Sequence, residues 1–432
     1  MAERCPLSVT LYLALSRLAG PVLRLLHAYR CKSGKDDPAR GEEKFGISGV
    51  VRPKGHLVWI HAASVGETAS VLSLISRLQA RGYTVLLTTV TRTSASLAQQ
   101  QLPNGAIHQY APYDSLSCWE RFLEHWQPDL ALCVESEIWP ASFVALARRG
   151  VPLCIVNGRM SEKSFNGWSQ VKTASRYLFG LPELVLAQSA ADAKRFSALG
   201  CTRVETPGNL KFDAAPDAPS RGELSGFRAT IGNRPRWLAA LTHPGEDAIA
   251  LDAHQRLLED TPDLLLMLVP RHPARGEDIS RLAADKGFAV LRRTQNLPVP
   301  ADAQVYVGDT LGEMNLFYSA ADVCFLGGSF VEVGGHNPVE AASFETALIS
   351  GPKVANARPV YRALWETGGA VRVSEPRLLA AEVRRLLDDA VARKEQTSAA
   401  AAVIAEGRGA LDRTLDFLSP YLAPSRSGER ET

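Results

Sequence analysis

From residue 57 onward, the chain alternates short apolar runs with longer stretches in which apolar residues recur at helical spacing. This alternation predicts strands joined by amphipathic helices, which is the pattern of a mostly parallel sheet. A first series of predicted strands covers residues 57–62, 83–90, 107–110, 130–134, 153–156 and 184–187. A second series covers residues 237–241, 264–269, 288–291, 305–307, 323–326 and 347–349. After about residue 376 the pattern is helical and predicts no further strand.

The two series are separated by residues 207–227, which are rich in proline and glycine and poor in apolar side chains. A chain of 432 residues is also too long for one ordinary hydrophobic core. We therefore predict an α/β protein of two Rossmann-like, doubly wound domains with a ligand cleft between them. The predicted parts are an N-terminal domain (57–213), a linker (214–226), a C-terminal domain (227–395), and a last helix with a tail (396–432).

Residues 7–29 form an apolar segment that Arg17 and Arg24 interrupt. Arg17 makes a cleaved signal peptide unexpected, and each arginine inside a spanning helix would cost about 2.5–3.5 kcal/mol. The first 54 residues carry ten Lys and Arg against five Asp and Glu. We predict a membrane-associating helix over residues 1–32, lying on an anionic surface with its arginine face toward lipid phosphates. The alternative is a surface helix that docks on its own protein. Residues 33–56 read as a polar connector.

Charge and motif content exclude several functional classes. The net charge is +2, which gives no general case for nucleic-acid binding. The seven cysteines are scattered without a C-x-x-C pair, which favours reduced thiols in a cytosolic compartment. The chain has no G-x-G-x-x-G after its first strand, no P-loop and no H-E-x-x-H, so dinucleotide, P-loop and metal-site interpretations are weak.

Carboxylates follow two predicted strands of the N-terminal domain, at the edge of the sheet where α/β folds bind ligands. Ser64 and Glu67 have the spacing of a capping box, so a helix cap and a catalytic carboxylate are equally good interpretations from these residues alone. Glu135 and Glu137 come directly after the strand at 130–134, either as a functional pair or as acids at a helix start. His61 is more readily a structural histidine than a ligand.

In the C-terminal domain, several strand-end loops carry groups suited to an anion. Arg271 follows a predicted strand and can clamp a phosphate with two hydrogen bonds. Residues 309–314 can aim backbone N–H groups at an anion. The glycines of 327–335 allow close backbone approach to a ligand, and Asn337 and Glu340 have capping-box spacing at the next helix start. The alternative is a well-capped helix after a glycine turn.

Seven motifs in the same order resemble those of the 3-deoxy-D-manno-octulosonic acid (Kdo) transferases of the lipopolysaccharide pathway. They are HAASVGE (61–67), VESEIWP (134–140), NGRMSEKS (157–164), GNLKFD (208–213), VPRHP (269–273), GDTLGEM (308–314) and GGHNPVE (334–340). The resemblance runs from about residue 45 to the last third of the chain. It implies a GT-B fold whose terminal helix crosses back to the first domain.

The resemblance also implies the reaction and the roles of individual residues. The expected enzyme is an inverting glycosyltransferase that moves Kdo from CMP-Kdo to lipid IVA, without metal or cofactor, on the cytoplasmic face of the bacterial inner membrane. Glu67 is expected to be the general base, and Glu137 and Lys211 are expected to stabilise charge in the transition state. The expected CMP-binding residues are Pro270, Arg271, Leu311, Gly312, Glu313, Met314, Asn337, Pro338, Val339 and Glu340.

At three positions this chain differs from the residues that are usual in the family it resembles. These positions are Ala141, Pro244 and His336. These departures concern contacts to donor and acceptor. Two alternatives stay open at this point. One is another GT-B nucleotide-sugar enzyme, either a different sugar transferase or an epimerase. The other is a non-catalytic protein of lipid surfaces, for which the acidic strand-end motifs have no use.

Overall fold

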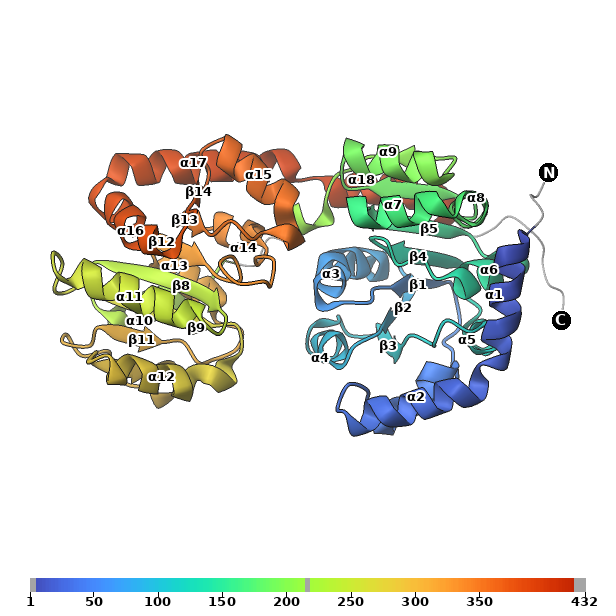
Figure 1. Cartoon of the computed structure of the whole chain (residues 1–432), viewed down its shortest axis with the longest axis horizontal. Helices are drawn as coiled ribbons and strands as arrows, with labels where there is room; N and C mark the ends of the chain where they lie inside the picture. The colour runs from blue at the N-terminus through green and yellow to red at the C-terminus, as the bar shows by residue number, and fades with distance from the viewer. Residues whose placement is uncertain (1–4, 214–217, 423–432) are drawn as a thin grey trace. The chain divides into compact units, whose positions relative to one another are not determined.

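A computed structural model describes residues 5–213 and 218–422 of the chain. Two compact units form: unit 1 (Met1–Ala214 and Gly407–Thr432) and unit 2 (Ala215–Glu406) (Figure 1). Each unit is an α/β structure built on one parallel sheet. Two parallel-sheet units were predicted from the apolar runs, and this part of the predicted fold class is confirmed.

Unit 1 contains a seven-stranded parallel sheet in the order β3-β2-β1-β4-β5-β6-β7. Its strands are β1 (Leu57–His61), β2 (Thr84–Thr89), β3 (Ile107–Tyr110), β4 (Leu130–Val134), β5 (Leu153–Gly158), β6 (Leu184–Ala187) and β7 (Val204–Glu205). The strand order reverses between β1 and β4, where Val58 pairs with Leu130. Ligands of such sheets bind beside this switch point, outside the carboxyl ends of the strands.

Helices cover both faces of the unit 1 sheet because alternate strand residues are apolar on each side. On one face, Trp59 packs with Trp119 and Phe143; on the other, Ile60 packs with Leu74 and Leu415. The helices are α3 (Val65–Ala80), α4 (Arg92–Gln101), α5 (Leu116–Trp126), α6 (Pro140–Arg149), α7 (Glu162–Gln170), α8 (Lys172–Phe179), α9 (Ala190–Leu199) and α18 (Ala410–Leu422). Short 3-10 helices lie at η1 (Pro38–Phe45) and η2 (Leu210–Phe212).

Unit 2 contains a second seven-stranded parallel sheet, in the order β10-β11-β9-β8-β12-β13-β14. Its strands are β8 (Arg236–Thr242), β9 (Leu265–Pro270), β10 (Val290–Arg292), β11 (Val305–Val307), β12 (Val323–Leu326), β13 (Ala347–Ser350) and β14 (Val371–Arg372). Here the order reverses between β8 and β12. The loops after these two strands therefore flank the expected ligand position of this unit.

The helices of unit 2 enclose a core that includes Trp237, Leu266 and Phe325. They are α10 (Arg221–Ile231), α11 (Glu246–Leu258), α12 (Gly276–Asp285), α13 (Met314–Ala320), α14 (Pro338–Ala342), α15 (Arg358–Glu366), α16 (Leu379–Asp388) and α17 (Ala390–Gly407). Four 3-10 helices complete the described part of the unit: η3 (Pro273–Arg275), η4 (Arg293–Gln295), η5 (Ala355–Ala357) and η6 (Pro376–Leu378).

Several element boundaries differ from the prediction. The two-residue strands β7 and β14 were not predicted, because two residues are too few to show a period. Residues 221–226 of the predicted linker belong to α10, which begins with the capping box of Ser220 and Glu223. The last helix was expected from residue 396, but α17 begins at Ala390 and a second helix, α18, follows it. Residues 1–4, 214–217 and 423–432 of the predicted parts lie outside the described residues.

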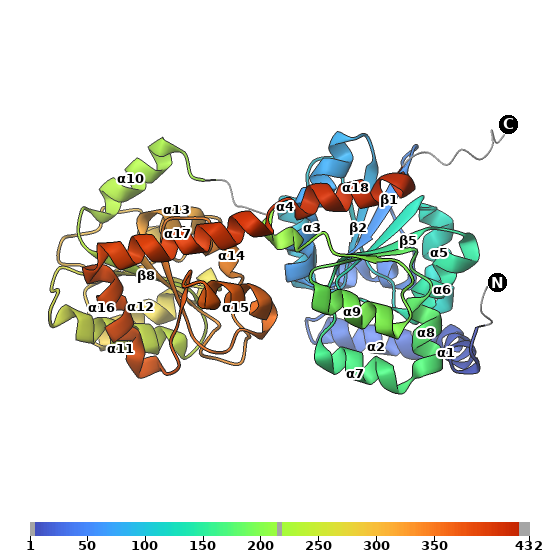
Figure 2. The same ribbon diagram turned by 90° about the horizontal axis from the view of Figure 1, so that it is seen from above.

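The predicted N-terminal helix is two helices, α1 (Leu7–Leu18) and α2 (Gly20–Lys32) (Figure 2). Among the described residues no single helix has both the length and the apolar content to cross a membrane, although α1 and α2 together meet that test with a 65° bend between them. The prediction of one arginine face is wrong because the bend lies between the two arginines. Arg17 pairs with Glu120 at 3.0 Å, and Arg24 stacks on the ring of Phe45.

Candidate active site in unit 1 and anion-suited loops in unit 2

Glu67 lies in the first turn of α3, directly after β1, and its carboxylate points back at its own loop. Oε2 accepts a hydrogen bond from the Ala63 N–H at 2.8 Å, and Oε1 accepts one from the Ser64 hydroxyl at 2.7 Å. Ser64 also caps the helix by accepting from the Glu67 N–H at 3.3 Å. The cap interpretation therefore describes the local structure correctly. A cap of this kind also holds a carboxylate in one fixed position at the ligand edge of the sheet.

The surroundings of Glu67 change its acidity. Its side chain is buried, and burial together with the negative charges of Glu137 and Glu135 raises the pKa of Glu67 to about 7. The hydrogen bonds from Ser64 and Ala63 act in the opposite direction. A carboxylate with a pKa near neutrality is a stronger proton acceptor than an ordinary glutamate and is still ionised in a working cell. Glu67 is therefore suited to accept a proton from a hydroxyl group.

The pKa of Glu67 predicts the pH dependence of the reaction. If Glu67 is the general base, kcat/KM for sugar transfer should rise with pH through an apparent pKa of about 7, because the ionised form is the active one. Glu137→Gln should move this rise to lower pH, because it removes a like charge that raises the pKa. Initial rates measured from about pH 5 to pH 9 would test both statements; a rate independent of pH across that range would contradict them.

Glu135, Glu137 and Lys211 lie beside Glu67, and each of the two glutamates has a different partner. Lys211 forms its ion pair with Glu135, at 3.0 Å between Nζ and Oε1. Glu137 instead accepts a hydrogen bond from the indole N–H of Trp139 at 2.9 Å. Glu135 is thus a site residue that the list of expected catalytic residues omits. Its φ of 57° is unusual for a residue other than glycine, and such strain concentrates at functional sites.

The loop that carries Lys211 is fixed from inside unit 1. Asn157, the fifth residue of β5, accepts a hydrogen bond from the Leu210 N–H at 3.0 Å through its side-chain oxygen. Asp213 accepts hydrogen bonds from the N–H groups of Gly409 and Leu411, both at 2.7 Å, at the start of α18. The C-terminal helix therefore supports the position of Lys211.

In unit 2, the loops after β8 and β12 are joined by a buried carboxylate that the sequence analysis did not single out. Glu246, fully buried at the start of α11, accepts hydrogen bonds from the N–H groups of Gly328 (2.6 Å), Ser329 (3.0 Å) and Phe330 (3.0 Å). Gly327 has no room for a side chain, because a Cβ there would lie 2.6 Å from the Leu241 carbonyl oxygen. The glycine loop is thus a closely packed, well-ordered structure.

Cationic and imidazole groups gather over this loop. His336 and His243 share a hydrogen bond of 2.9 Å between their Nε2 atoms. Burial and, to a smaller extent, the positive charge of Arg271 lower the pKa of His336 to about 3. The Arg271 guanidinium is exposed and, within the described residues, makes no hydrogen bond or ion pair. Arg271 is therefore available for an anionic ligand near the switch point of this sheet.

The remaining residues expected to bind CMP lie in the same unit. They differ in how far their side chains are already engaged in bonds within the protein. Glu313 is held by Arg293 at 2.8 and 3.1 Å, which lowers the pKa of Glu313, so its side chain is already engaged. Leu311 is 76 % exposed and Gly312 has a φ of 80°. Asn337 caps α14 by accepting from the Val339 N–H at 3.3 Å, but Glu340 does not complete the expected capping box. The Glu340 carboxylate is therefore not used by the cap, and burial raises its pKa while the charge of Arg271 opposes that rise.

The site residues thus form two groups, one in each unit. Glu67, Glu135, Glu137 and Lys211 lie together in unit 1. In unit 2, Pro270 is the last residue of β9 and Arg271 follows it. The residues at 311–314 and 337–340 come after β11 and β12. Across the described residues, 5–213 and 218–422, no three His, Cys, Asp or Glu side chains are arranged to hold a metal ion.

Comparison with known proteins identifies relatives along most of the chain. Residues 39–214 match the family of 3-deoxy-D-manno-octulosonic-acid transferases. The chain is 34% identical over 388 residues to such a transferase from Haemophilus influenzae, covering 88% of this chain and 91% of the relative. It is 35% identical over 394 residues to one from Bordetella pertussis, covering 88% and 91%.

Among solved structures, a UDP-GlcNAc 2-epimerase from Neisseria meningitidis has a similar fold, with a TM-score of 0.58, 14% identity, and coverage of 84% of this chain and 100% of the other. This likeness shows the fold, which is the two-sheet GT-B type. The identity along nearly the whole length of the transferases goes further. The chain belongs to the 3-deoxy-D-manno-octulosonic acid transferase family and is a glycosyltransferase that transfers Kdo in lipopolysaccharide biosynthesis.

Proposed function

We propose that this enzyme transfers Kdo from CMP-Kdo to lipid IVA with inversion of the anomeric centre, at the cytoplasmic face of the bacterial inner membrane. One observation carries the chemical part of the proposal. Glu67 is fixed at the carboxyl edge of a Rossmann-like sheet, and burial together with Glu137 raises its pKa to about 7. A fixed carboxylate of this acidity is what a sugar hydroxyl needs in order to attack a donor carbon.

In the proposed reaction, Glu67 accepts the proton of the acceptor hydroxyl while that oxygen attacks the anomeric carbon of Kdo. The anomeric carbon gains positive, oxocarbenium-like charge, as in glycoside hydrolysis. Negative carboxylates at Glu137 and Glu135 and the Lys211 ammonium provide a fixed charge arrangement around the acceptor. Direct displacement of CMP inverts the anomeric centre.

The donor part of the proposal assigns CMP to unit 2. Arg271 and the N–H groups of the 311–314 loop are suited to the phosphate, and Glu340, on the helix that Asn337 caps, is suited to ribose hydroxyls. The cation and the N–H dipoles supply the charge that the departing CMP requires. The proposal therefore uses no metal and no cofactor.

Binding of free nucleotides tests this assignment. Arg271→Ala should weaken CMP binding about tenfold or more in calorimetric titration, because a charge-assisted phosphate contact contributes about 1.5–3 kcal/mol. Arg281→Ala is the matched control and should leave CMP binding unchanged, since Arg281 forms its ion pairs with Glu277 and Asp278 of its own helix in unit 2. The parent protein should bind CMP in preference to UDP; preference for UDP would favour a UDP-sugar enzyme, and an unaltered affinity in Arg271→Ala would contradict the assigned site.

The membrane part of the proposal rests on the outward face of α1 and α2. Val9 and Leu13 of α1 are buried against the rest of unit 1, whereas α1 and α2 each expose a row of apolar side chains. These are Leu7, Leu11, Leu15, Leu18, Val22, Leu25, Leu26 and Tyr29. An exposed apolar row of this kind favours contact with a lipid surface. The helices thus dock on their own protein with one face and offer the other, which joins the two interpretations of this segment.

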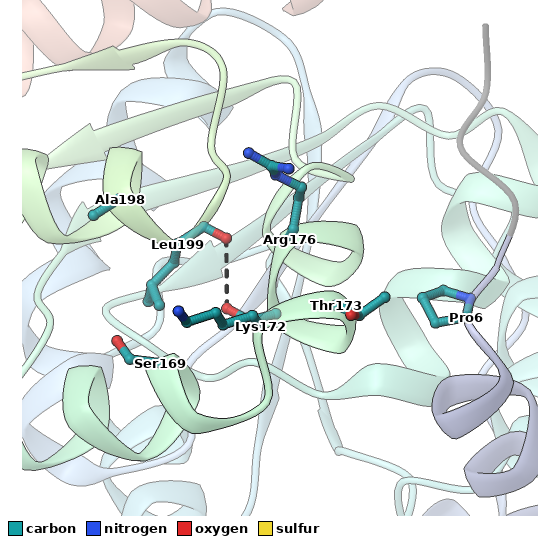
Figure 3. A pocket seen from close by; sticks show the side chains of 8 residues that line it. Pro6, Ser169, Lys172, Thr173, Arg176, Ala198 and Leu199 are labelled. Atoms are coloured by element: carbon teal, nitrogen blue, oxygen red, sulfur yellow. Dashed lines mark hydrogen bonds between the residues drawn. The ribbon is translucent and has the colours of Figure 1, made fainter.

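A basic pocket adjoins this segment (Figure 3). It has a volume of about 610 Å³ and is lined by Pro6, by Ser169 of α7, by residues of α8 that include Lys172 and Arg176, and by the end of α9. Within residues 5–213 and 218–422, neither of these cations has a hydrogen bond or an ion pair. Basic side chains beside an apolar helix face are attracted to anionic lipid, and this supports the proposed membrane surface.

Sedimentation with lipid vesicles tests the membrane part. Leu15→Ala combined with Leu25→Ala should lower binding to vesicles containing phosphatidylglycerol about thirtyfold, because each truncation removes apolar area worth about 1 kcal/mol on insertion. Leu297→Ala with Val391→Ala is the control, since both residues are exposed in unit 2. Lys172→Ser with Arg176→Ser should weaken binding to anionic but not to neutral vesicles. Parent-like sedimentation of the double leucine variant would contradict the membrane assignment.

A further inference from the structure

His61 is the last residue of β1, and the sequence suggests only a structural histidine there. Its ring is buried, with 4 % of the residue exposed. Nδ1 lies 3.0 Å from the Thr88 hydroxyl, which also accepts the indole N–H of Trp59 at 2.9 Å. Nε2, in contrast, is buried and has no hydrogen-bond partner in the described part of the chain. Buried polar atoms in folded proteins nearly always have a hydrogen-bond partner, which is either a protein group or an ordered water molecule.

The space beside His61 identifies that partner. A cavity of about 10 Å³ is lined by His61, Cys133, Glu137 and Ser142, with apolar residues such as Trp59 and Phe143 forming the rest of the wall. One water molecule needs roughly this much room and two or more polar neighbours. Among the lining side chains, His61, Glu137 and Ser142 keep unused hydrogen-bonding capacity. The Glu137 carboxylate has received only the Trp139 N–H, and the Ser142 hydroxyl donates to the Trp139 carbonyl but can still accept.

We propose that a water molecule binds in this cavity and links His61 Nε2 to the Glu137 carboxylate, which makes His61 a positioning residue for the transfer reaction. The water can accept from an Nε2–H or donate to a bare Nε2, and it donates to Glu137 in either case. Trp139 on one side and the water on the other then fix the Glu137 carboxylate beside Glu67. This inference rests on the proposed roles of Glu67 and Glu137.

Burial lowers the pKa of His61 to about 3, so the imidazole is neutral throughout the working range and acts by hydrogen bonding. The ionisable groups around it are Lys44, whose charge acts on His61, and Glu67 and Glu135, which lie with Glu137. Glu135 is neutralised by Lys211. Loss of the water should leave the Glu137 carboxylate free to turn away from Glu67, and the pKa of Glu67 should then fall, because part of its rise comes from the nearby charge of Glu137.

Two substitutions of His61 distinguish the role of Nε2, which faces the cavity, from the role of Nδ1. The amide of glutamine can reach the position of Nε2, whereas asparagine reaches only the position of Nδ1. His61→Asn should lower kcat about tenfold, leave KM for CMP-Kdo nearly unchanged, and move the acidic limb of the pH–rate profile to lower pH. His61→Gln should keep kcat within about threefold of the parent and keep the limb in place.

His108→Asn is the matched control, because His108 is a half-buried histidine of the same sheet with both ring nitrogens bonded, to Thr89 and Arg40. It should leave the limb unchanged. In a Glu137→Gln background, His61→Asn should cause no additional shift. An unshifted limb in folded His61→Asn, or a full additional shift in that background, would overturn the proposal.

A high-resolution crystal structure of the parent protein provides a test that needs no activity and no variant. It should show a water within about 3.2 Å of both His61 Nε2 and a Glu137 carboxylate oxygen. Absence of that water would refute the link even if every kinetic result agreed. Failure of the proposed function is distinguishable, because an active Glu67→Gln enzyme would remove the catalytic role while the water could still be observed.

Discussion

Replacing Glu67 with glutamine should lower kcat for Kdo transfer by about 10²–10⁴, because the acceptor hydroxyl then has no group to take its proton. Glutamine has nearly the same shape, and its one oxygen can accept from the Ala63 N–H while its NH2 group faces the Ser64 hydroxyl. The cap of α3 should remain, because it is formed by the backbone N–H of residue 67 and the Ser64 hydroxyl. CMP binding should be retained, because the expected CMP-binding loops belong to unit 2. Steady-state kinetics and CMP titration of the same preparation measure both effects.

Ser64→Ala separates the two functions of this helix start. It removes the hydroxyl that caps α3 but leaves the Glu67 carboxylate, so it should cost about 1 kcal/mol of stability and retain most of the activity. Because the Ser64 hydrogen bond lowers the pKa of Glu67, its loss should raise that pKa and move the acidic limb to higher pH. Full turnover by Glu67→Gln would show that this glutamate is only a cap.

Lys211→Met should lower kcat by about 10²–10³, which is the usual effect of removing one fixed group that stabilises transition-state charge. The ion pair with Glu135 complicates this experiment, since Lys211→Met also leaves a largely buried carboxylate without a partner. Kinetics of Lys211→Met, Glu135→Gln and the combined variant resolve the question.

If Lys211 acts on the reacting groups, the combined variant should remain as slow as Lys211→Met, while Glu135→Gln alone should lose less than about tenfold. If the lysine only neutralises Glu135, removing both partners should restore activity. Recovery of parent-like kcat in the combined variant would therefore contradict the transition-state role of Lys211. Thermal denaturation of all three variants would measure the effect of each substitution on stability separately.

The main strands were predictable because each is an apolar run, as at Leu130–Val134, and burial on both faces of a parallel sheet demands such runs. The break between α1 and α2 was not predicted, since Gly20 and Pro21 sit inside an otherwise apolar segment and only the tertiary packing fixes the 65° bend. Local spacing likewise predicted the Ser64 cap on α3.

Side-chain partners distant in sequence could not be predicted from spacing. Lys211 and Glu135 are 76 residues apart, and His243 and His336 are 93 apart. Glu246 joins two loops of unit 2 by accepting backbone N–H groups from residues more than 80 positions away. The fold brings these groups together at the two switch points. Their region was predictable, because open α/β sheets bind ligands outside the carboxyl ends of their strands. The individual contacts depend on how the loops and helices pack.

The central claim is that this protein transfers Kdo from CMP-Kdo to lipid IVA, and mass spectrometry of the acceptor tests it most directly. Lipid IVA incubated with CMP-Kdo and the parent protein should gain the mass of one or more Kdo residues, and the same mixture with Glu67→Gln should gain almost none. An acceptor whose mass is unchanged after incubation with folded, CMP-binding parent protein would contradict the account.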